Sequence, residues 1–397
     1  MNRRELLAVL MASALPFPAD AAGSDIAWLI DEMVAKYAYL RDRHIDLARL
    51  RQIYVAEEQA ATDARAFLGV LEHFLAEFHD HHIEANTNNN RSPQLVPTGT
   101  DLWAVMRDGR AFIDQVRPDS PSSHAGVRIG DEVLTIGGVP VKAAIAAHAP
   151  RCLVTRDPEA DDYTLRVLLA GTHDAHRAFT LRDRKIDLPP YVAPKSDALV
   201  THRMIDGIGV IRIENSLGED GLVAAFDKTL ADLSQARALI LDLRDTQSGG
   251  NTEVAEPIMG RFITGRPGYQ RVFDPGPGKT FPEDSWVRWV RERGPTVQQK
   301  LAVLVNRWTG SMGEGMAIGF DGMKRGTVVG TRMAGLCGAT DGITLPNSGI
   351  GVHFPTERLY HLDNTPREKW KPPVLVDLAT AKGDDPILTR ALEVLKA

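Results

Sequence analysis

The sequence predicts an α/β protein in three parts: an N-terminal helical cap, a β domain and a C-terminal domain of alternating strands and helices. Three observations support this fold class. A length of 397 residues indicates two or three folding units, at roughly one to two hundred residues per domain. Apolar residues recur at three- and four-residue spacing before residue 85. Beyond residue 200, nearly all-apolar strands alternate with helical segments, as in a parallel sheet.

The composition excludes some classes of partner. A content of 43% hydrophobic and 25% charged residues is typical of a globular protein, and a net charge of −6 without a long basic run gives no reason to expect nucleic acid. The two cysteines, Cys152 and Cys337, lack the spacing of metal ligands. We therefore expect no structural metal and no cofactor, and we leave open whether the two cysteines pair.

Residues 1–23 have the layout of a removable export signal. Arg3 and Arg4 precede an apolar run of about a dozen residues, and small residues follow at Ala19 to Ala22. The run is too short to span a bilayer, and no other stretch has the roughly twenty apolar residues of a membrane helix. We expect a location outside the cytoplasm, either periplasmic or secreted, and the paired arginines also resemble a twin-arginine signal. A buried first helix is the alternative.

The cap is expected over residues 24–93. The segments IAWLIDEMVAKYAYL and DARAFLGVLEHFLAEFH have helical apolar spacing and few Gly or Pro residues. The cap ends in NTNNNRSPQLVPTG, a polar stretch rich in Asn and Pro that marks a domain boundary.

The β domain is expected over residues 95–190. Its segment FIDQVRPDSPSSHAGVRIGDEVLTIGGVPV contains short alternating strands joined by turns and a short helix. This passage resembles the PDZ family in its A-G segment at Ser123 to Gly126, its G-D turn at Gly130 and Asp131, and its hairpin from Val133 to Val141. The resemblance implies an extended peptide partner, because PDZ domains bind peptides as an added strand. A generic antiparallel β domain is the alternative.

The C-terminal domain is expected over residues 195–397. The strands IGVIRI, ALILDLR and LAVLVN alternate with the helices GLVAAFDKTLADLS, TEVAEPIMGRFI and SMGEGMAIGF. Sites in such sheets form at the carboxyl ends of the strands, which directs attention to the loops after Arg244 and Asn306. In the second loop Ser311 stands at a strand-to-helix turn, where the helix N-terminus would stabilise an oxyanion. A plain N-cap is the alternative for a lone serine.

Two motifs in these loops occur together. The first is D-L-R followed by G-G-N, and the second is N-x-x-T-x-S-x-x-E. Together they resemble motifs of the tail-specific or C-terminal processing serine peptidases, whose fold is related to the crotonase and Clp protease spiral. The resemblance implies that Ser311 is the nucleophile, with Glu314 three residues on. It places Asp242 and Arg244 at the strand end. It also implies an oxyanion hole formed by backbone N–H groups of Gly249, Gly250 and Met312.

The base that many relatives use is missing. Their lysine lies in a G-x-x-T-x-G-K-G segment, and the matching GTRMAGLCG has Leu336 at that position. Arg332 cannot replace it, since a guanidinium does not deprotonate. A second branch, which includes the tricorn core protease, uses a histidine in an L-x-D-G-H segment. Here AEFHDHHIEANT resembles that segment, with Asp80 and His82 in place and His81 at the glycine position.

Alternatives for His82 remain open. The run His79, Asp80, His81 and His82 could bind a metal, although adjacent helical residues point in different directions, or it could be a solvated helix end. His81 rather than His82 could also be the base. The branch's orienting glutamate corresponds loosely to Glu368 in NTPREKWKPPVLVDL, with Glu357 and Asp363 as substitutes.

The sequence therefore predicts an exported serine endopeptidase with the triad Ser311, His82 and Glu368, acting on peptides or on the C-terminal tails of proteins. A peptide or unfolded protein is the expected partner. Two other readings stay open: a non-catalytic PDZ-type peptide-binding protein with a degenerate protease domain, and a crotonase-like acyl-CoA enzyme. Shared fold does not dictate function, and export would remove the protein from the CoA pool.

Overall fold

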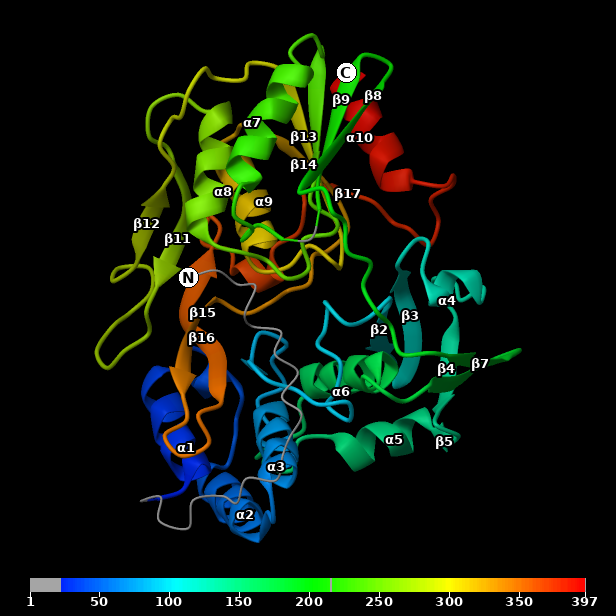
Figure 1. Cartoon of the computed structure of the whole chain (residues 1–397), viewed down its shortest axis with the longest axis vertical. Helices are drawn as coiled ribbons and strands as arrows, with labels where there is room; N and C mark the ends of the chain where they lie inside the picture. Colours follow the sequence, from blue (N-terminus) through cyan, green and yellow to red (C-terminus); the bar gives the residue numbers. More distant parts are fainter. Residues whose placement is uncertain (1–22, 215, 397) are drawn as a thin grey trace.

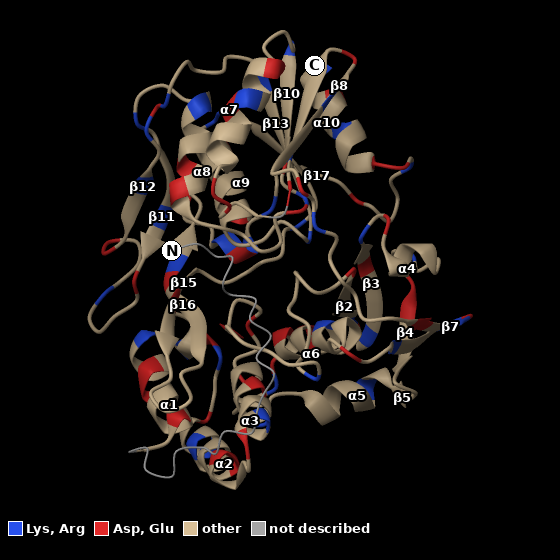
Figure 2. Cartoon of the chain, viewed as in Figure 1, with Lys and Arg blue, Asp and Glu red and all other residues tan. Residues whose placement is uncertain are grey.

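The computed structural model describes residues 23–214 and 216–396 (Figure 1). The predicted export signal lies outside these residues except for Gly23. The described part is a mixed α/β structure with three β-sheets. Lys and Arg residues are interspersed with Asp and Glu over all its parts (Figure 2). None of the described helices is long and apolar enough to cross a membrane.

Three helices form the N-terminal part. They are α1 (Asp25–Lys36), α2 (Leu47–Ala60) and α3 (Ala64–Ala76), with a short 3-10 helix at Leu40–Asp42. Each begins at a polar N-cap, because the side chains of Ser24, Asp46 and Asp63 accept a backbone N–H three residues on. Their apolar faces share one core with each other and with a long β-hairpin from the C-terminal part of the chain.

The middle part is an antiparallel sheet. Its strands have the order β2-β3-β4-β6-β7, and β5 pairs with β4. The strands are β2 (Leu102–Arg107), β3 (Arg110–Val116), β4 (Glu132–Ile136), β5 (Val139–Pro140), β6 (Arg177–Leu181) and β7 (Lys185–Leu188). The helices are α4 (Pro121–His124), α5 (Val141–His148) and α6 (Pro158–Ala170). Strand β2 is at one edge of this sheet, and α6 packs beside it.

The C-terminal part contains a six-stranded sheet with the order β17-β14-β13-β10-β9-β8. All neighbouring strands are parallel except β8 and β9. The strands are β8 (Val200–Ile205), β9 (Ile208–Ile213), β10 (Ala238–Asp242), β13 (Lys300–Val305), β14 (Thr327–Gly330) and β17 (Val374–Leu375). The predicted βαβ series and its largely parallel sheet are thus present.

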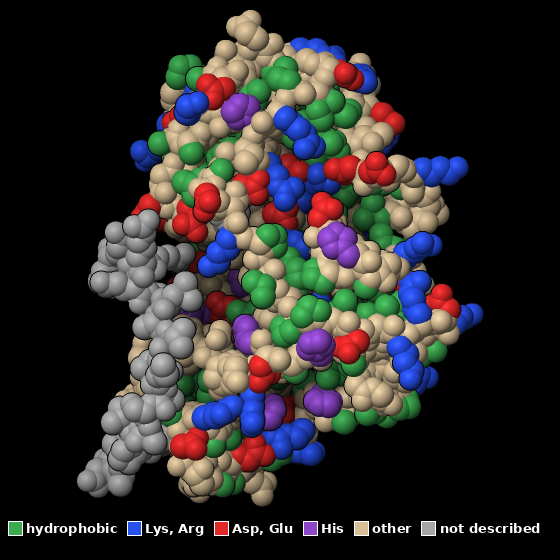
Figure 3. Space-filling model, turned by 45° about the vertical axis from the view of Figure 1, so that its right-hand side comes forward, with side chains coloured by type: hydrophobic (Ala, Val, Ile, Leu, Met, Phe, Trp, Pro, Cys, Tyr) green, Lys and Arg blue, Asp and Glu red, His purple; other side chains and the backbone are tan. Residues whose placement is uncertain are grey.

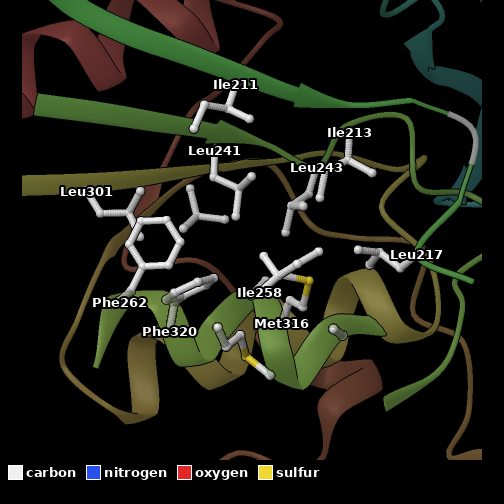
Figure 4. Close-up of a cluster of buried hydrophobic side chains, with 14 of the residues drawn as sticks. Ile211, Ile213, Leu217, Leu241, Leu243, Ile258, Phe262, Leu301, Met316 and Phe320 are labelled. Carbon is white, nitrogen blue, oxygen red and sulfur yellow. The ribbon is translucent and has the colours of Figure 1, made fainter. Parts of the chain in front are cut away.

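Helices cover both faces of this sheet. They are α7 (Leu222–Asp232), α8 (Thr252–Met259) and α9 (Met312–Gly322) on one face and α10 (Pro386–Lys396) on the other. Figure 4 shows the first face, where Ile211, Leu241 and Leu301 of the strands meet Phe262, Ile258 and Phe320 from the helical layer. Strand β10 is buried along its whole length. This explains its nearly all-apolar sequence.

A third sheet joins the C-terminal part to the helices of the N-terminal part. Its order is β1-β16-β11-β12, with β15 also on β16. The strands are β1 (Glu84–Ala85), β11 (Gly268–Phe273), β12 (Trp286–Trp289), β15 (Ala339–Thr344) and β16 (Gly351–Tyr360). In Figure 1 the β15–β16 hairpin extends from the level of α9 down to α1. The sequence analysis did not predict this hairpin.

Asp25 fastens the N-terminal helices to the tip of that hairpin. Its fully buried carboxylate accepts the backbone N–H groups of Asn347 and Ser348, each at 2.8 Å. Strand β1 pairs with β16 a short distance away. These two contacts set where the chain leaves α3, and so where residues 79–82 lie.

We expect Asp25→Ala to lower the free energy of unfolding by about 3 kcal/mol, because two buried N–H groups lose a charged acceptor. Urea unfolding followed by circular dichroism measures it. Asp31→Ala is the matched control, since Asp31 is an exposed partner of Arg51 and should change stability by less than about 1 kcal/mol. Equal effects of the two changes would contradict a fastening role for Asp25.

Candidate active site

Ser311 occupies a sharp turn between a buried strand and a buried helix. Strand β13 ends at Val305 and α9 begins at Met312, which leaves Ser311 at the helix N-terminus. Its φ of 49° lies in the left-handed region, which side chains other than glycine rarely adopt. The Glu314 carboxylate accepts the Ser311 backbone N–H at 2.9 Å and so holds this strained turn. A nucleophile in such a turn projects its hydroxyl away from the sheet.

His82 reaches Ser311 from the N-terminal part, 229 residues earlier in the chain. Its Nε2 lies 3.0 Å from Ser311 Oγ, and its Nδ1 lies 2.5 Å from the carbonyl oxygen of Cys337. A carbonyl can only accept, so Nδ1 carries the proton and donates to Cys337. Nε2 is then free to accept the Ser311 hydroxyl proton. This is the tautomer that a general base beside a serine needs.

A buried network holds the backbone of His82. Asp80 accepts the His82 N–H at 2.9 Å and the Tyr37 hydroxyl at 2.8 Å. Arg43 donates to Tyr37 Oη at 3.0 Å and to Cys337 Sγ at 3.3 Å. The two segments that position the imidazole are therefore tied to each other. Sequence reasoning singled out Asp80 but not Tyr37 or Arg43, whose roles depend on contacts across the fold.

The neighbouring histidines point elsewhere. His79 Nε2 lies 3.0 Å from Asp157. The His81 ring stacks on Tyr163 with centroids 4.5 Å apart, and its buried Nε2 has no hydrogen-bond partner among the described residues. No group of three or more His, Cys, Asp or Glu side chains in the described ranges is arranged to hold a metal ion. Of the histidines in this run, His82 is the one that contacts Ser311.

Burial, with the nearby Arg367 cation second, lowers the pKa of His82 to about 4. The imidazole is thus neutral at ordinary pH. Burial also raises the pKa of Glu314 to about 7. This side chain is fully buried and accepts the N–H groups of Gly335 at 2.9 Å and Leu336 at 3.2 Å as well as that of Ser311.

Arg367 binds the Ser311 turn and the 335–338 loop, which Glu314 also binds, but through their carbonyl groups. It is 3% exposed and donates to the carbonyl oxygens of Ser311 at 3.2 Å, Leu336 at 2.9 Å and Gly338 at 2.7 Å. The sequence motif pointed to the next residue, Glu368, and not to Arg367. No local pattern marks an arginine whose partners are backbone carbonyls.

The predicted oxyanion-hole residues flank Ser311. Gly249 has φ of 64°, and a Cβ built on it would lie 2.9 Å from Ser311 Oγ and 3.1 Å from the Met312 backbone nitrogen. Only glycine fits there. The Gly249 N–H donates to the Thr246 carbonyl at 2.9 Å in this structure. Gly250 pairs with Leu217 in a short parallel bridge, and a Cβ on it would collide with the backbone there.

Glu368 is near this site but does not bind the imidazole in this structure. Its carboxylate accepts the Tyr39 hydroxyl at 3.5 Å, and no hydrogen bond among the described residues joins it to His82. The Cys337 carbonyl accepts the hydrogen bond from His82 Nδ1–H instead. Of the two substitutes, Asp363 pairs with His361 at 2.9 Å, and Glu357 lies on β16 opposite Ala339.

Leu336, at the position of the missing lysine, is an apolar packing residue. It is buried with Val96, Trp103 and Ala334. Arg244 is held by Asp242 at 2.8 Å and Asp385 at 2.7 Å, so the D-L-R motif forms a partly buried ion-pair network at the strand end. Both cysteines are free and buried.

The middle sheet is fastened to both loops that carry the site. Thr100 accepts Trp308 Nε1–H at 2.8 Å beside the Ser311 turn. Arg117 pairs with Asp245 and donates to Gln247 at 3.2 Å in the loop before Gly249. A cleft of about 940 Å³ lies at this junction. Charged side chains of both signs gather midway down one face of the molecule (Figure 3).

The comparisons agree with this geometry. The family description "Peptidase family S41" matches residues 207–375, which include Ser311 and the glycine loop. Residues 207–375 are thus similar to peptidase family S41. The carboxy-terminal processing protease CtpB of Bacillus subtilis (strain 168) is 24% identical over 161 residues, 40% of this chain. The match spans 31% of CtpB, so this chain aligns with about a third of that relative.

Solved structures of S41-type proteases share the fold over nearly the whole chain. The photosystem II D1 C-terminal processing protease superposes with a TM-score of 0.57 at 18% identity, covering 95% of this chain and 98% of its own. Mature CPAF gives a TM-score of 0.58 at 15% identity, with 94% and 95% covered. These findings confirm the resemblance to C-terminal processing peptidases that the sequence predicted. They also confirm the mixed α/β class.

Glu314 and His82 should make the stability of the protein depend on pH in opposite directions. Glu314 has a pKa of about 7 against an ordinary value of 4.5, so the folded state keeps a proton that the unfolded chain loses, and its contribution to stability falls as pH rises between these values. His82 has a pKa of about 4 against 6.5, so its contribution is lost as pH falls from 6.5 to 4.

We expect Glu314→Gln to remove the first effect. Relative to wild type, the variant should gain up to about 2 kcal/mol of unfolding free energy between pH 4.5 and pH 6.5. Urea titrations of both proteins at the two pH values measure the difference. A variant whose stability changes with pH in parallel with wild type would show that Glu314 is ionised throughout.

Proposed function

We propose that the protein is an exported serine endopeptidase that cleaves peptides or the C-terminal tails of proteins through an acyl-enzyme. The observation that carries this proposal is the 3.0 Å contact between His82 Nε2 and Ser311 Oγ, at a helix N-terminus in the segment similar to peptidase family S41. The names of CtpB and of the D1 protease describe C-terminal processing in those proteins, which supports the same class of substrate here.

In the proposed reaction His82 Nε2 takes the Ser311 hydroxyl proton while Oγ attacks the peptide carbonyl. The carbonyl oxygen becomes an oxyanion, stabilised by the Met312 N–H and by that of Gly250 or Gly249. For Gly249 this requires its bond to Thr246 to open. The imidazolium then returns the proton to the leaving amine, and water releases the acyl group by the same steps in reverse.

The third member of the catalytic set is proposed to be the Cys337 carbonyl in the form described here. It fixes the Nδ1–H tautomer, the task that a carboxylate performs in Ser-His-Asp sites. The sequence-based choice of Glu368 stays a prediction, because the carboxylate is buried nearby and Tyr39 is its hydrogen-bond partner. The histidine-using branch of the family fits a chain with Leu336 in place of lysine.

Residues 95–190 are proposed to act as a PDZ-like peptide-binding module next to a 195–397 spiral catalytic domain and a 24–93 cap. The middle sheet ends in β2 on one side and β7 on the other, and a peptide strand is proposed to add to the edge of β2, beside which α6 packs. Asp162 and Arg166 of α6 already occupy it: Asp162 accepts the Met106 N–H at 2.6 Å, and Arg166 donates to the Ala104 carbonyl at 3.1 Å. A peptide adding to β2 must displace these two side chains.

A fluorophosphonate probe tests the nucleophile. We expect wild type to be labelled, Ser311→Ala to remain unlabelled, and His82→Ala to react more slowly by roughly a thousandfold or more, since each removes part of one proton-transfer unit. His81→Ala is the matched control and should label within a few-fold of wild type. Equal labelling of wild type and Ser311→Ala would reject Ser311. Peptide binding without labelling or cleavage would favour a non-catalytic peptide-binding protein.

Glu368→Gln distinguishes the two orienting groups. If the Cys337 carbonyl orients His82, the variant should retain at least about a tenth of the wild-type kcat/KM, whereas loss of an orienting carboxylate costs on the order of 10⁴ in rate. Steady-state cleavage of an unfolded protein substrate measures the difference. A loss near the larger figure would restore Glu368 to the triad and imply that Tyr39 releases it when substrate binds.

A further inference from the structure

The structure contains a buried guanidinium whose hydrogen-bond partners are all backbone carbonyls of the active site. Arg367 begins a short 3-10 helix (Arg367–Lys369) and binds the carbonyls of Ser311, Leu336 and Gly338. Its Nε has no partner in the described part of the chain. Burying a charge costs free energy unless hydrogen bonds compensate for the lost hydration. The role of Arg367 should therefore follow from the backbone carbonyls that it binds.

Arg367 and Glu314 act on complementary atoms of the same two segments. Glu314 accepts the N–H groups of Ser311, Gly335 and Leu336, while Arg367 takes the carbonyls on the other side. Ser311 and Leu336 are each held by both side chains. The serine turn and the 335–338 loop are therefore clamped together, with the acid satisfying donors and the guanidinium satisfying acceptors.

The loop held in this way carries the atom that orients the imidazole. Cys337 lies between Leu336 and Gly338, and Arg367 fixes the carbonyl on each side of it. Peptide planes are rigid, so fixing two neighbouring carbonyls restricts the direction of the one between them. That carbonyl receives the His82 Nδ1–H.

Arg367 also supplies the cation that faces the imidazole. The charged and titratable groups around His82 are Asp80 from the loop after α3, Arg367 from the 3-10 helix and the Cys337 thiol, with Glu314 of α9 beside Arg367. Asp80 favours the imidazolium, and Arg367 disfavours it. Removing Arg367 should therefore raise the pKa of His82, because the Asp80 charge would no longer be offset.

We propose that Arg367 is a positioning residue of the catalytic site, which aims the Cys337 carbonyl at His82 Nδ1 and ties that carbonyl to the backbone of the nucleophile. The kinetic side of this inference rests on the proposed peptidase function, whereas the orientation of His82 does not. Arg367 contacts no atom that a substrate would occupy, because its partners are carbonyls of the chain itself.

The test compares Arg367→Met, which removes the charge and the fork, with Arg367→Lys, which keeps a charge but cannot bond three carbonyls at once. Lys369→Met is the matched control, an exposed cation two residues away. The readouts are kcat and KM for peptide cleavage, the rate of fluorophosphonate labelling, and the pH titration of the His82 imidazole by ¹⁵N NMR.

We expect both Arg367 variants to lose kcat by about a hundredfold with KM nearly unchanged, since a small misplacement of a catalytic group has that effect. The His82 pKa should rise in Arg367→Met and stay near the wild-type value in Arg367→Lys. The control should match wild type in every readout. A merely structural role would not separate the two variants in the titration.

The proposal is overturned if either variant cleaves and labels like wild type, if the loss lies in KM, or if His82 titrates in Arg367→Met as it does in wild type. Should Arg367→Met fail to fold, Arg367→Lys and the recovery of Arg367→Ala labelling by added guanidinium ion decide the question. If wild type neither cleaves nor labels, the peptidase proposal fails, and the His82 titration still tests Arg367.

Discussion

The contact between His82 and Ser311 depends on how the N-terminal helices dock. The two residues are 229 positions apart, and no lysine replaces the histidine locally, because Leu336 is buried in an apolar cluster. The pairing of β1 with β16 and the hydrogen bonds from the hairpin tip to Asp25 hold the N-terminal helices where the imidazole reaches the hydroxyl. An error of about 1 Å in this docking would cost roughly a hundredfold in rate.

Local patterns were sufficient to predict many of the elements and to single out Ser311 and His82, which the structure brings into contact. Strand β10 is all-apolar because both faces are buried, and Ser311 follows a strand and precedes a helix, so the sequence marks both. The β15–β16 hairpin was missed, since strand β15 is largely exposed or half-buried and lacks a clear alternation. No sequence pattern marked the group that contacts His82 Nδ1 in this structure, the Cys337 carbonyl. Every residue carries a carbonyl, and nothing in a sequence shows which one, here that of Cys337, will face an imidazole.

A neutral orienting group changes the electrostatics of the base. A carboxylate on Nδ1 would favour the imidazolium and raise the pKa of His82, whereas a carbonyl adds little, and burial with Arg367 then brings the pKa to about 4. The His82 imidazole is thereby neutral at ordinary pH. Its driving force for proton uptake is correspondingly small. In the proposed mechanism, a weaker base leaves more of the stabilisation to the oxyanion donors, which are the Met312 N–H at the start of α9 and the glycine loop.

The Gly249 turn and the edge of β2 share one feature. Its N–H is bound to Thr246, and Asp162 and Arg166 cover the edge of β2, so two sets of atoms that a peptide would use already have partners within the chain. The middle sheet connects the two, because Arg117 bonds the 245–247 loop and Trp308 bonds Thr100. The middle sheet and the two loops around Ser311 are therefore joined by contacts that are already present.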